Sequence, residues 1–111
     1  MNNILFVCSA NVDRSKTAED FFSEQFNNFK FQSAGTNHKI CQQAGTNPLD
    51  QETLDWADKV FVMEKKHSDW IYTNLEAKGI DIQVLNIEDR YTYYSMNLIE
   101  ILQQKCNRFF E

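Results

Sequence analysis

The chain has 111 residues, of which 42% are hydrophobic and 14% aromatic, a composition typical of a packed domain rather than of a disordered chain. Its formal net charge of −5 argues against broad binding of nucleic acid or of anionic membranes, so any recognition of phosphate has to be local. The length predicts one domain over residues 1–111 with a single core.

The cysteines are odd in number and widely spaced, which does not indicate a disulfide framework. Neither they nor the two histidines show a zinc-binding spacing, and we expect no metal or cofactor. The first residues lack the charged and apolar regions of a signal peptide, and no segment approaches the roughly 20 apolar residues that cross a bilayer. We therefore expect a cytoplasmic protein without membrane or nucleic-acid partners.

The first half of the chain predicts two strands, a helix between them and a long loop. Residues 4–7 are a short apolar run, typical of a strand that is buried on both faces. Residues 29–33 alternate and predict a second strand, whereas residues 36–48 are polar, contain the only proline, and predict a loop with at most one turn of helix. Between the strands, apolar side chains recur at helical spacing at Ala18, Phe21, Phe22, Phe26 and Phe29.

The second half continues the alternation of helix and strand. In order, we expect a helix over 50–57, a strand over 59–63 and a helix over 64–78 with Gly79 as its C-terminal cap. A strand over 80–85 and a tyrosine-rich loop over 86–95 follow. The last helix is expected from about 95 to 109, with these residues facing inward: Leu98, Ile99, Leu102 and Cys106 or Phe109. Four such strand–helix units predict an α/β fold: a four-stranded parallel sheet with helices on both faces. Ligands of such sheets bind outside the carboxyl ends of the strands.

Residues 8–15 form the segment with the clearest chemistry. Cys8 ends the first strand, and five residues later Arg14 and Ser15 open a helix. A loop of this length can curl round a tetrahedral dianion with its backbone N–H groups pointing inward, next to a helix N-terminus. Arg14 offers a planar fork for two phosphate oxygens, and the positive surroundings favour the thiolate form of Cys8. The segment thus predicts a nucleophile in a phosphate-binding loop formed by Ser9, Ala10, Asn11, Val12, Asp13, Arg14 and Ser15.

Four ordered blocks of the chain resemble the low-molecular-weight protein tyrosine phosphatase family. They are residues 5–19, with the Cys-x5-Arg-Ser pattern; 33–36, Ser-Ala-Gly-Thr; 57–64, from Ala-Asp to Met-Glu; and 87–91, Ile-Glu-Asp-Arg-Tyr. The chain is similar to a short, divergent member, and the comparison implies the loss of a helix where residues 37–48 lie. It departs from the pattern at Ala10, where the family has glycine, at Asp13 in place of a second cysteine, and at Lys16 in place of proline. A positive φ at Ala10 would cost about 1 kcal/mol.

The resemblance implies a role for each site residue. Cys8 is the expected nucleophile, Arg14 the phosphate clamp, and Asp89 the general acid, although Asp13 is a rival by its position in the loop. Ser15 is expected to donate a hydrogen bond to the Cys8 thiolate or to cap the helix. The residue type alone makes Asn11 a candidate for a left-handed backbone position.

Side chains around the loop complete the expected site. His38, Tyr91 and Tyr93 are expected to flank the substrate, although the tyrosines are nearly as well explained by packing against the last helix. Arg90 is expected either to orient Asp89 or attract the substrate, or to be solvated. His67 is expected on a helix surface, and Trp56 and Trp70 in the packing.

Three functions are consistent with these residues. The first is a cysteine-dependent phosphomonoester hydrolase, expected to act on phosphotyrosine in proteins or on small aryl phosphates and to release inorganic phosphate. The second is a pseudophosphatase that binds phosphate or phosphotyrosine without turnover because of Ala10, Asp13 and Lys16. The third is arsenate reduction, which would need a further redox pair that Cys41 and Cys106 do not obviously supply.

Overall fold

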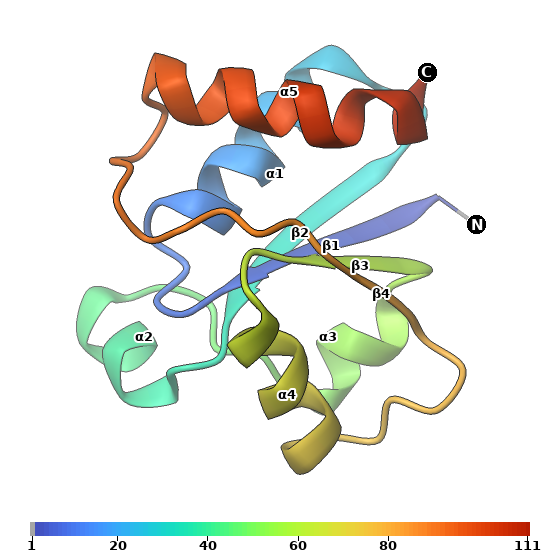
Figure 1. Ribbon diagram of the computed structural model, residues 1–111. Helices are drawn as coiled ribbons and strands as arrows, with labels where there is room; N and C mark the ends of the chain where they lie inside the picture. The colour runs from blue at the N-terminus through green and yellow to red at the C-terminus, as the bar shows by residue number, and fades with distance from the viewer. Residues whose placement is uncertain (1) are drawn as a thin grey trace.

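The computed structural model describes residues 2–111 and shows a four-stranded sheet covered by helices (Figure 1). The elements in chain order are β1 (Asn3–Cys8), α1 (Arg14–Gln25), β2 (Lys30–Gly35), α2 (His38–Ala44), α3 (Gln51–Trp56), β3 (Lys59–Val62), α4 (Lys65–Asn74), β4 (Asp81–Val84) and α5 (Met96–Phe110).

The sheet is parallel throughout, with the strand order β2-β1-β3-β4. Cys8, the last residue of β1, pairs with Gly35 at the end of β2, and Val7 pairs with Val62 at the end of β3. The loops that follow these strands therefore leave from one edge of the sheet, where ligands of open α/β sheets bind. The predicted fold class is confirmed.

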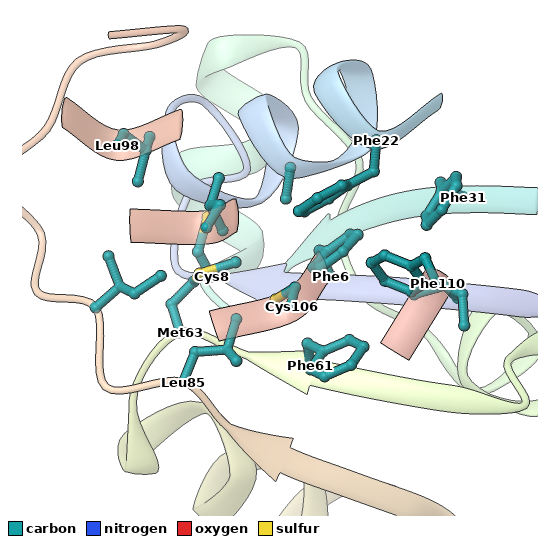
Figure 2. Close-up of a cluster of buried hydrophobic side chains, with 14 residues drawn as sticks. Phe6, Cys8, Phe22, Phe31, Phe61, Met63, Leu85, Leu98, Cys106 and Phe110 are labelled. Carbon is teal, nitrogen blue, oxygen red and sulfur yellow. The ribbon is translucent and has the colours of Figure 1, made fainter. Parts of the chain in front are cut away.

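The two faces of the sheet bury different side chains because neighbours along a strand point in opposite directions. Helices α1 and α5 cover one face, and α3 and α4 cover the other (Figure 1). Phe6 and Cys8 pack with residues of α1 and α5, and Leu5 and Val7 pack with residues of α3 and α4. The first layer is aromatic, with the Phe6 ring 5.6 Å from Phe22 and 5.5 Å from Phe61 (Figure 2). Cys8 belongs to the same buried cluster and lies near Met63 (Figure 2).

The expectation for residues 36–48 was wrong, because these residues contain α2. The helix begins at Asn37, whose side chain accepts a hydrogen bond from the Ile40 N–H, and it ends at Gly45 in a left-handed conformation. Only Cys41 of this helix is buried. A helix with one buried residue has no apolar period, which explains why the sequence pattern did not indicate it.

The helix expected over 64–78 ends earlier, at Asn74, and Gly79 is not its cap. Leu75 is extended, and residue Glu76 is held by Gln51 of α3 through two hydrogen bonds, from Glu76 N–H to Oε1 and from Nε2 to Glu76 O. Gly79, at φ 82°, lies in the turn before β4. Contacts with α3 thus override the local preference for a longer helix.

In the last helix, α5, one of the residues predicted to face inward differs from the residue that is buried. Leu98, Ile99, Leu102 and Cys106 are buried as predicted, but the inward aromatic residue is Phe110, whereas Phe109 is partly exposed. Among the residues that the structure describes, no helix combines the length and the apolar character needed to cross a membrane.

Candidate active site

Loop 8–15 connects the end of β1 to the start of α1, so the fold brings Cys8 and Arg14 to the two ends of one tight turn. Asn11 has φ 57°, which confirms the predicted left-handed position. Ala10 is not among the residues with positive φ in the described chain, so the replacement of the family glycine imposes no such strain there. The positive φ in this loop thus falls on an asparagine, a residue type that tolerates it.

Three side chains of this loop form a directed chain of hydrogen bonds. The Asn11 Oδ1 atom accepts from the Asn47 N–H at 3.2 Å, so the Asn11 amide nitrogen faces Ser15 and donates to its Oγ at 2.8 Å. Ser15 Oγ lies 3.0 Å from Cys8 Sγ. Because a thiolate can only accept, the Ser15 hydroxyl donates to the sulfur whenever Cys8 is ionised. Cys8, Asn11 and Ser15 are all buried.

Arg14 is 2% exposed, which is unusual for an arginine and requires partners for its charge. Its Nη1 donates to Glu64 Oε1 at 2.6 Å and to the Ile87 carbonyl at 2.8 Å. The hydrogen bond from Arg14 lowers the pKa of Glu64, which keeps the carboxylate ionised opposite the guanidinium. Within residues 2–111, Nη2 makes no hydrogen bond, so this edge of the fork remains available to an anion.

The segment that follows β2 supports the loop from the side. A Cβ atom on Gly35 would lie 2.5 Å from the Ser9 carbonyl oxygen and 2.6 Å from Cys41 Sγ, so only glycine fits beneath the loop. Thr46 Oγ1 donates to the Ala10 carbonyl at 2.6 Å. The Thr36 N–H donates to the Cys8 carbonyl at 2.9 Å. The Ser-Ala-Gly-Thr block of the sequence thus serves as a platform for the loop.

His67 was misjudged from the sequence, since it is buried beneath the loop rather than on a helix surface. Its Nδ1 accepts from the Glu64 N–H at 3.0 Å, and its Nε2 lies 2.9 Å from Ser9 Oγ. Burial, together with the nearby Arg14 charge, lowers the pKa of His67 to about 4, so the ring is neutral at ordinary pH. The four-residue spacing from His67 to buried Ile71 would have indicated the inward face of α4.

Asp89 lies on the exposed loop that follows β4 and Ile87. Ile87 is buried, its N–H donates to the Met63 carbonyl at 2.8 Å, and its carbonyl accepts from Arg14. The loop then places Asp89 Oδ1 3.7 Å from Arg14 Nε, while the Asp89 side chain remains 62% exposed. The structure therefore brings Asp89 beside the Nε atom of Arg14.

The rival and neighbouring charges lie elsewhere. Asp13 immediately precedes α1, and its side chain makes no capping hydrogen bond there. Arg90 forms an ion pair with Glu88 at 3.0 Å, and its guanidinium carbon lies 5.5 Å from the centre of the Tyr91 ring.

The predicted flanking residues separate into two groups. His38 lines a cavity of about 590 Å³ beside Ser9, and its ring lies 5.4 Å from that of Trp70. Tyr91 is half-buried against the aromatic layer. Tyr93 is not brought to the loop, because its hydroxyl bonds to Asp20 on the outer side of α1. A second cavity of about 550 Å³ flanks the loop at Val12.

Comparison with known proteins agrees with this architecture. The model of a family described as low molecular weight phosphotyrosine protein phosphatase matches residues 3–49, the part that contains β1, loop 8–15 and β2. A search of curated proteins finds no match.

Solved structures resemble the chain over nearly its whole length. The tyrosine phosphatase Wzb from Escherichia coli K30 in complex with phosphate has a TM-score of 0.78 at 20% identity, covering 97% of this chain and 95% of that one. The low molecular weight protein tyrosine phosphatase from T. tengcongensis has a TM-score of 0.78 at 20% identity, covering 98% and 99%. The YwlE arginine phosphatase from Geobacillus stearothermophilus has a TM-score of 0.67 at 23% identity, covering 98% and 95%.

The fold is therefore that of the low-molecular-weight phosphatases. The resemblance to this family, first seen in four blocks of the sequence, is confirmed.

Proposed function

We propose that the chain is a cysteine-dependent phosphomonoester hydrolase that works through a cysteinyl-phosphate intermediate. The observation that carries this proposal is the buried hydrogen-bond chain from Asn11 through Ser15 to Cys8, next to an arginine fork with one edge unoccupied within residues 2–111. Such a buried chain of hydrogen bonds stabilises a negative charge on the sulfur atom, because each donor in the chain is directed towards the sulfur end. It supports a thiolate that is held ready beside a phosphate site.

In the first step, the Cys8 thiolate attacks phosphorus, a sulfur–phosphorus bond forms, and the bond from phosphorus to the ester oxygen breaks. Arg14 and the backbone N–H groups of loop 8–15 hold the equatorial oxygens as charge moves through a loose transition state. Asp89 gives its proton to the departing oxygen. Its closeness to the Arg14 fork supports this assignment, and Asp13 has no comparable contact with Arg14.

In the second step, water attacks phosphorus and inorganic phosphate is released. Asp89, now ionised, takes one proton from the water as the new oxygen–phosphorus bond forms. The sulfur–phosphorus bond breaks and the electron pair returns to sulfur, where the Ser15 hydroxyl donates a hydrogen bond to the regenerated thiolate. No metal or cofactor takes part in either step.

We infer that phosphotyrosine in proteins is the substrate. Val12 presents an apolar side chain, 40% exposed, in the loop that would hold the phosphoryl group. An apolar surface at this position suits an aromatic ring. Because one similar structure is an arginine phosphatase, turnover of phosphotyrosine and of phosphoarginine has to be compared directly.

The alternatives from the sequence have less support. The inactive binding protein was suggested partly by Ala10, which carries no positive φ. Arsenate reduction needs a second reactive thiol. Cys106 is fully buried in the aromatic layer, where burial raises the pKa of its thiol to about 12, and Cys41 is also fully buried. The three free cysteines fit a cytoplasmic location, which we propose.

The experiment is hydrolysis of p-nitrophenyl phosphate in the presence of a chelator. We expect turnover by the wild-type chain, inhibition by vanadate, and no turnover by Cys8→Ser with an unchanged melting temperature. Cys106→Ala is the matched control, since it removes a buried thiol that the mechanism does not use. Normal turnover by Cys8→Ser contradicts the proposal.

A further inference from the structure

The cavity beside Ser9 has a chemical character that the hydrolysis reaction does not require. It has a volume of about 590 Å³ and lies between loop 8–15, the start of α2 and the first turns of α4. Its lining residues are Ser9, Thr36, Asn37, His38, Lys66 and Trp70. Of these, only Ser9 belongs to the phosphate loop, so the cavity extends away from the reacting atoms.

The Ser9 hydroxyl accepts a hydrogen bond from His67, so its own hydrogen is available to donate to another group. The Glu64 backbone N–H can only donate, so the Nδ1 atom of His67 is the acceptor and the neutral ring carries its proton on Nε2. Nε2–H therefore donates to Ser9 Oγ. The hydroxyl hydrogen of Ser9 must then point to another acceptor, and Ser9 borders the cavity.

Two further polar groups around the cavity, Asn37 and Lys66, have hydrogens that are available to a ligand, whereas the ring N–H of His38 is already bonded. Asn37 Oδ1 accepts from the Ile40 N–H, which leaves the amide hydrogens on Nδ2 without a partner in residues 2–111. The His38 Nε2–H donates to the Leu49 carbonyl at 2.7 Å, so this hydrogen is not available to a ligand. Lys66 is 63% exposed, and its Nζ lies 3.8 Å from the nearest Glu64 oxygen, a loose ion pair. The cavity is thus rich in donors and carries one positive charge.

We propose that this cavity is a subsite for a carboxylate, namely an aspartate or glutamate side chain next to the phosphorylated residue of a protein substrate. A carboxylate has only acceptors and matches the free donors of Ser9, Asn37 and Lys66. The proposal rests on the proposed function, which places the phosphoryl group in loop 8–15. Ser9 is adjacent to Cys8, and an extended peptide advances about 3.4 Å per residue, so a side chain one or two positions from the phosphotyrosine reaches the cavity.

This assignment also explains how an acidic protein selects an acidic substrate. The net charge of −5 repels anions at long range, and salt screens that repulsion beyond about 8 to 10 Å. Selection must therefore come from short contacts, and Ser9, Asn37 and Lys66 all line the cavity. Exposed ion pairs contribute little individually, so a preference of about 5-fold is expected rather than an absolute requirement.

The test compares two phosphotyrosine peptides that differ only in having Glu or Gln at the positions flanking the phosphotyrosine. We expect kcat/KM to be about 5-fold higher for the Glu peptide. Lys66→Ala should remove most of this preference. The matched control is Lys65→Ala, since Lys65 is also exposed but pairs with Asp69 away from the cavity and should leave the preference intact. Turnover of p-nitrophenyl phosphate should be the same in all three chains.

Binding separates this inference from the proposed function. The Cys8→Ser chain should bind the Glu peptide more tightly than the Gln peptide, and the double variant with Lys66→Ala should bind both alike. Failure to hydrolyse p-nitrophenyl phosphate would overturn the proposed function, while the binding preference would still report on the subsite. Equal binding and equal kcat/KM for the two peptides, or a preference that Lys66→Ala leaves unchanged, would overturn the subsite.

Discussion

Loop 8–15 and loop 86–95 supply the two halves of the proposed reaction, and the structure holds them in very different ways. In the first, Asn11, Arg14 and Ser15 are no more than 3% exposed, and their partners outside the loop come from three other segments of the chain, at Asn47, Glu64 and Ile87. In the second, residues 88–90 are exposed, and only buried Ile87 fixes the start of the loop. The phosphate-binding half is thus part of the core, whereas the proton-delivering half lies at the surface.

This difference has a physical reason. A buried guanidinium must be matched by fixed acceptors, and Glu64 and the Ile87 carbonyl supply them, so the geometry of the clamp is tied to the stability of the fold. A general acid has to meet both a substrate oxygen and a water molecule, and an exposed carboxylate can do so without a cost in desolvation. Substitution of Arg14 should therefore affect stability and activity together, and substitution of Asp89 should affect activity alone.

The largest effect is expected from Arg14→Lys. Lysine keeps the charge but loses the planar fork and cannot serve Glu64, Ile87 and a phosphate at once. We expect kcat/KM for p-nitrophenyl phosphate to fall about 1,000-fold and the melting temperature to fall as well. Steady-state kinetics and thermal unfolding measure the two effects, and a chain that loses activity without losing stability would break the link between them.

The next effect is expected from Asp89→Asn, which tests the exposed half alone. Loss of a general acid costs about 100-fold or more in kcat for phenyl phosphate, whose leaving group needs a proton. Because Asp89 is 62% exposed, the free energy of unfolding should change by less than about 0.5 kcal/mol. Asp13→Asn is the control and should retain activity; the reverse result would assign the acid to Asp13.

A smaller effect, on stability, is expected from Asn11→Ala. Alanine disfavours the left-handed backbone of this position and removes the bonds to Ser15 and Asn47, so the free energy of unfolding should fall by about 2 to 3 kcal/mol. Asn11→Gly keeps the backbone freedom and loses only the side-chain bonds, so its loss should be smaller by about 1 kcal/mol. Urea unfolding measures both, and equal losses would exclude a contribution from backbone strain.

The smallest effect is expected from pH, through His67. Its pKa is lowered to about 4 in the folded chain, against an ordinary value of about 6.5 when unfolded. Below pH 6.5 the unfolded chain binds a proton that the folded chain does not, so stability falls as pH drops towards 4 and is constant above 6.5. Between pH 7 and pH 5 the loss should be about 2 kcal/mol.

The matched control for the pH effect is His67→Gln, whose stability should not show this slope. The pKa of Glu64 is lowered, so its carboxylate contributes to the pH dependence only below its ordinary range and does not disturb the window. Urea unfolding at several pH values makes the comparison. The same slope in both chains would contradict the neutral, buried state of His67.

The sequence predicted the parts of the molecule that depend on local pattern. The apolar run before Cys8, the spacing to Arg14 and the alternation of strands and helices were enough to predict the sheet and the turn from β1 into α1, because these patterns lie in residues close in sequence. The left-handed Asn11 followed from the type of residue alone. Asp89 was reached through the family resemblance, and its contact with Arg14 spans most of the chain.

The sequence did not reveal the features that depend on distant partners. His67 contacts Ser9 across 58 residues, and Glu64 contacts Arg14 across 50, so neither role leaves a local signal. Helix α2 has one buried residue, and α4 ends where α3 takes over its hydrogen bonds. Tyr93 lies close to Asp89 in sequence, but its hydroxyl is drawn to Asp20 on α1. In each of these cases a tertiary contact decides the outcome.

The central claim, that Cys8 forms a covalent bond to phosphorus, is tested most directly by a stopped-flow experiment on Asp89→Asn with p-nitrophenyl phosphate. Nitrophenolate needs no proton to leave, while hydrolysis of the intermediate is slowed by the missing base. We predict a rapid burst that approaches one nitrophenolate per chain, followed by slow turnover, and no burst when Cys8→Ser is added. Linear release from the start in Asp89→Asn, or a burst that survives Cys8→Ser, would contradict the covalent mechanism.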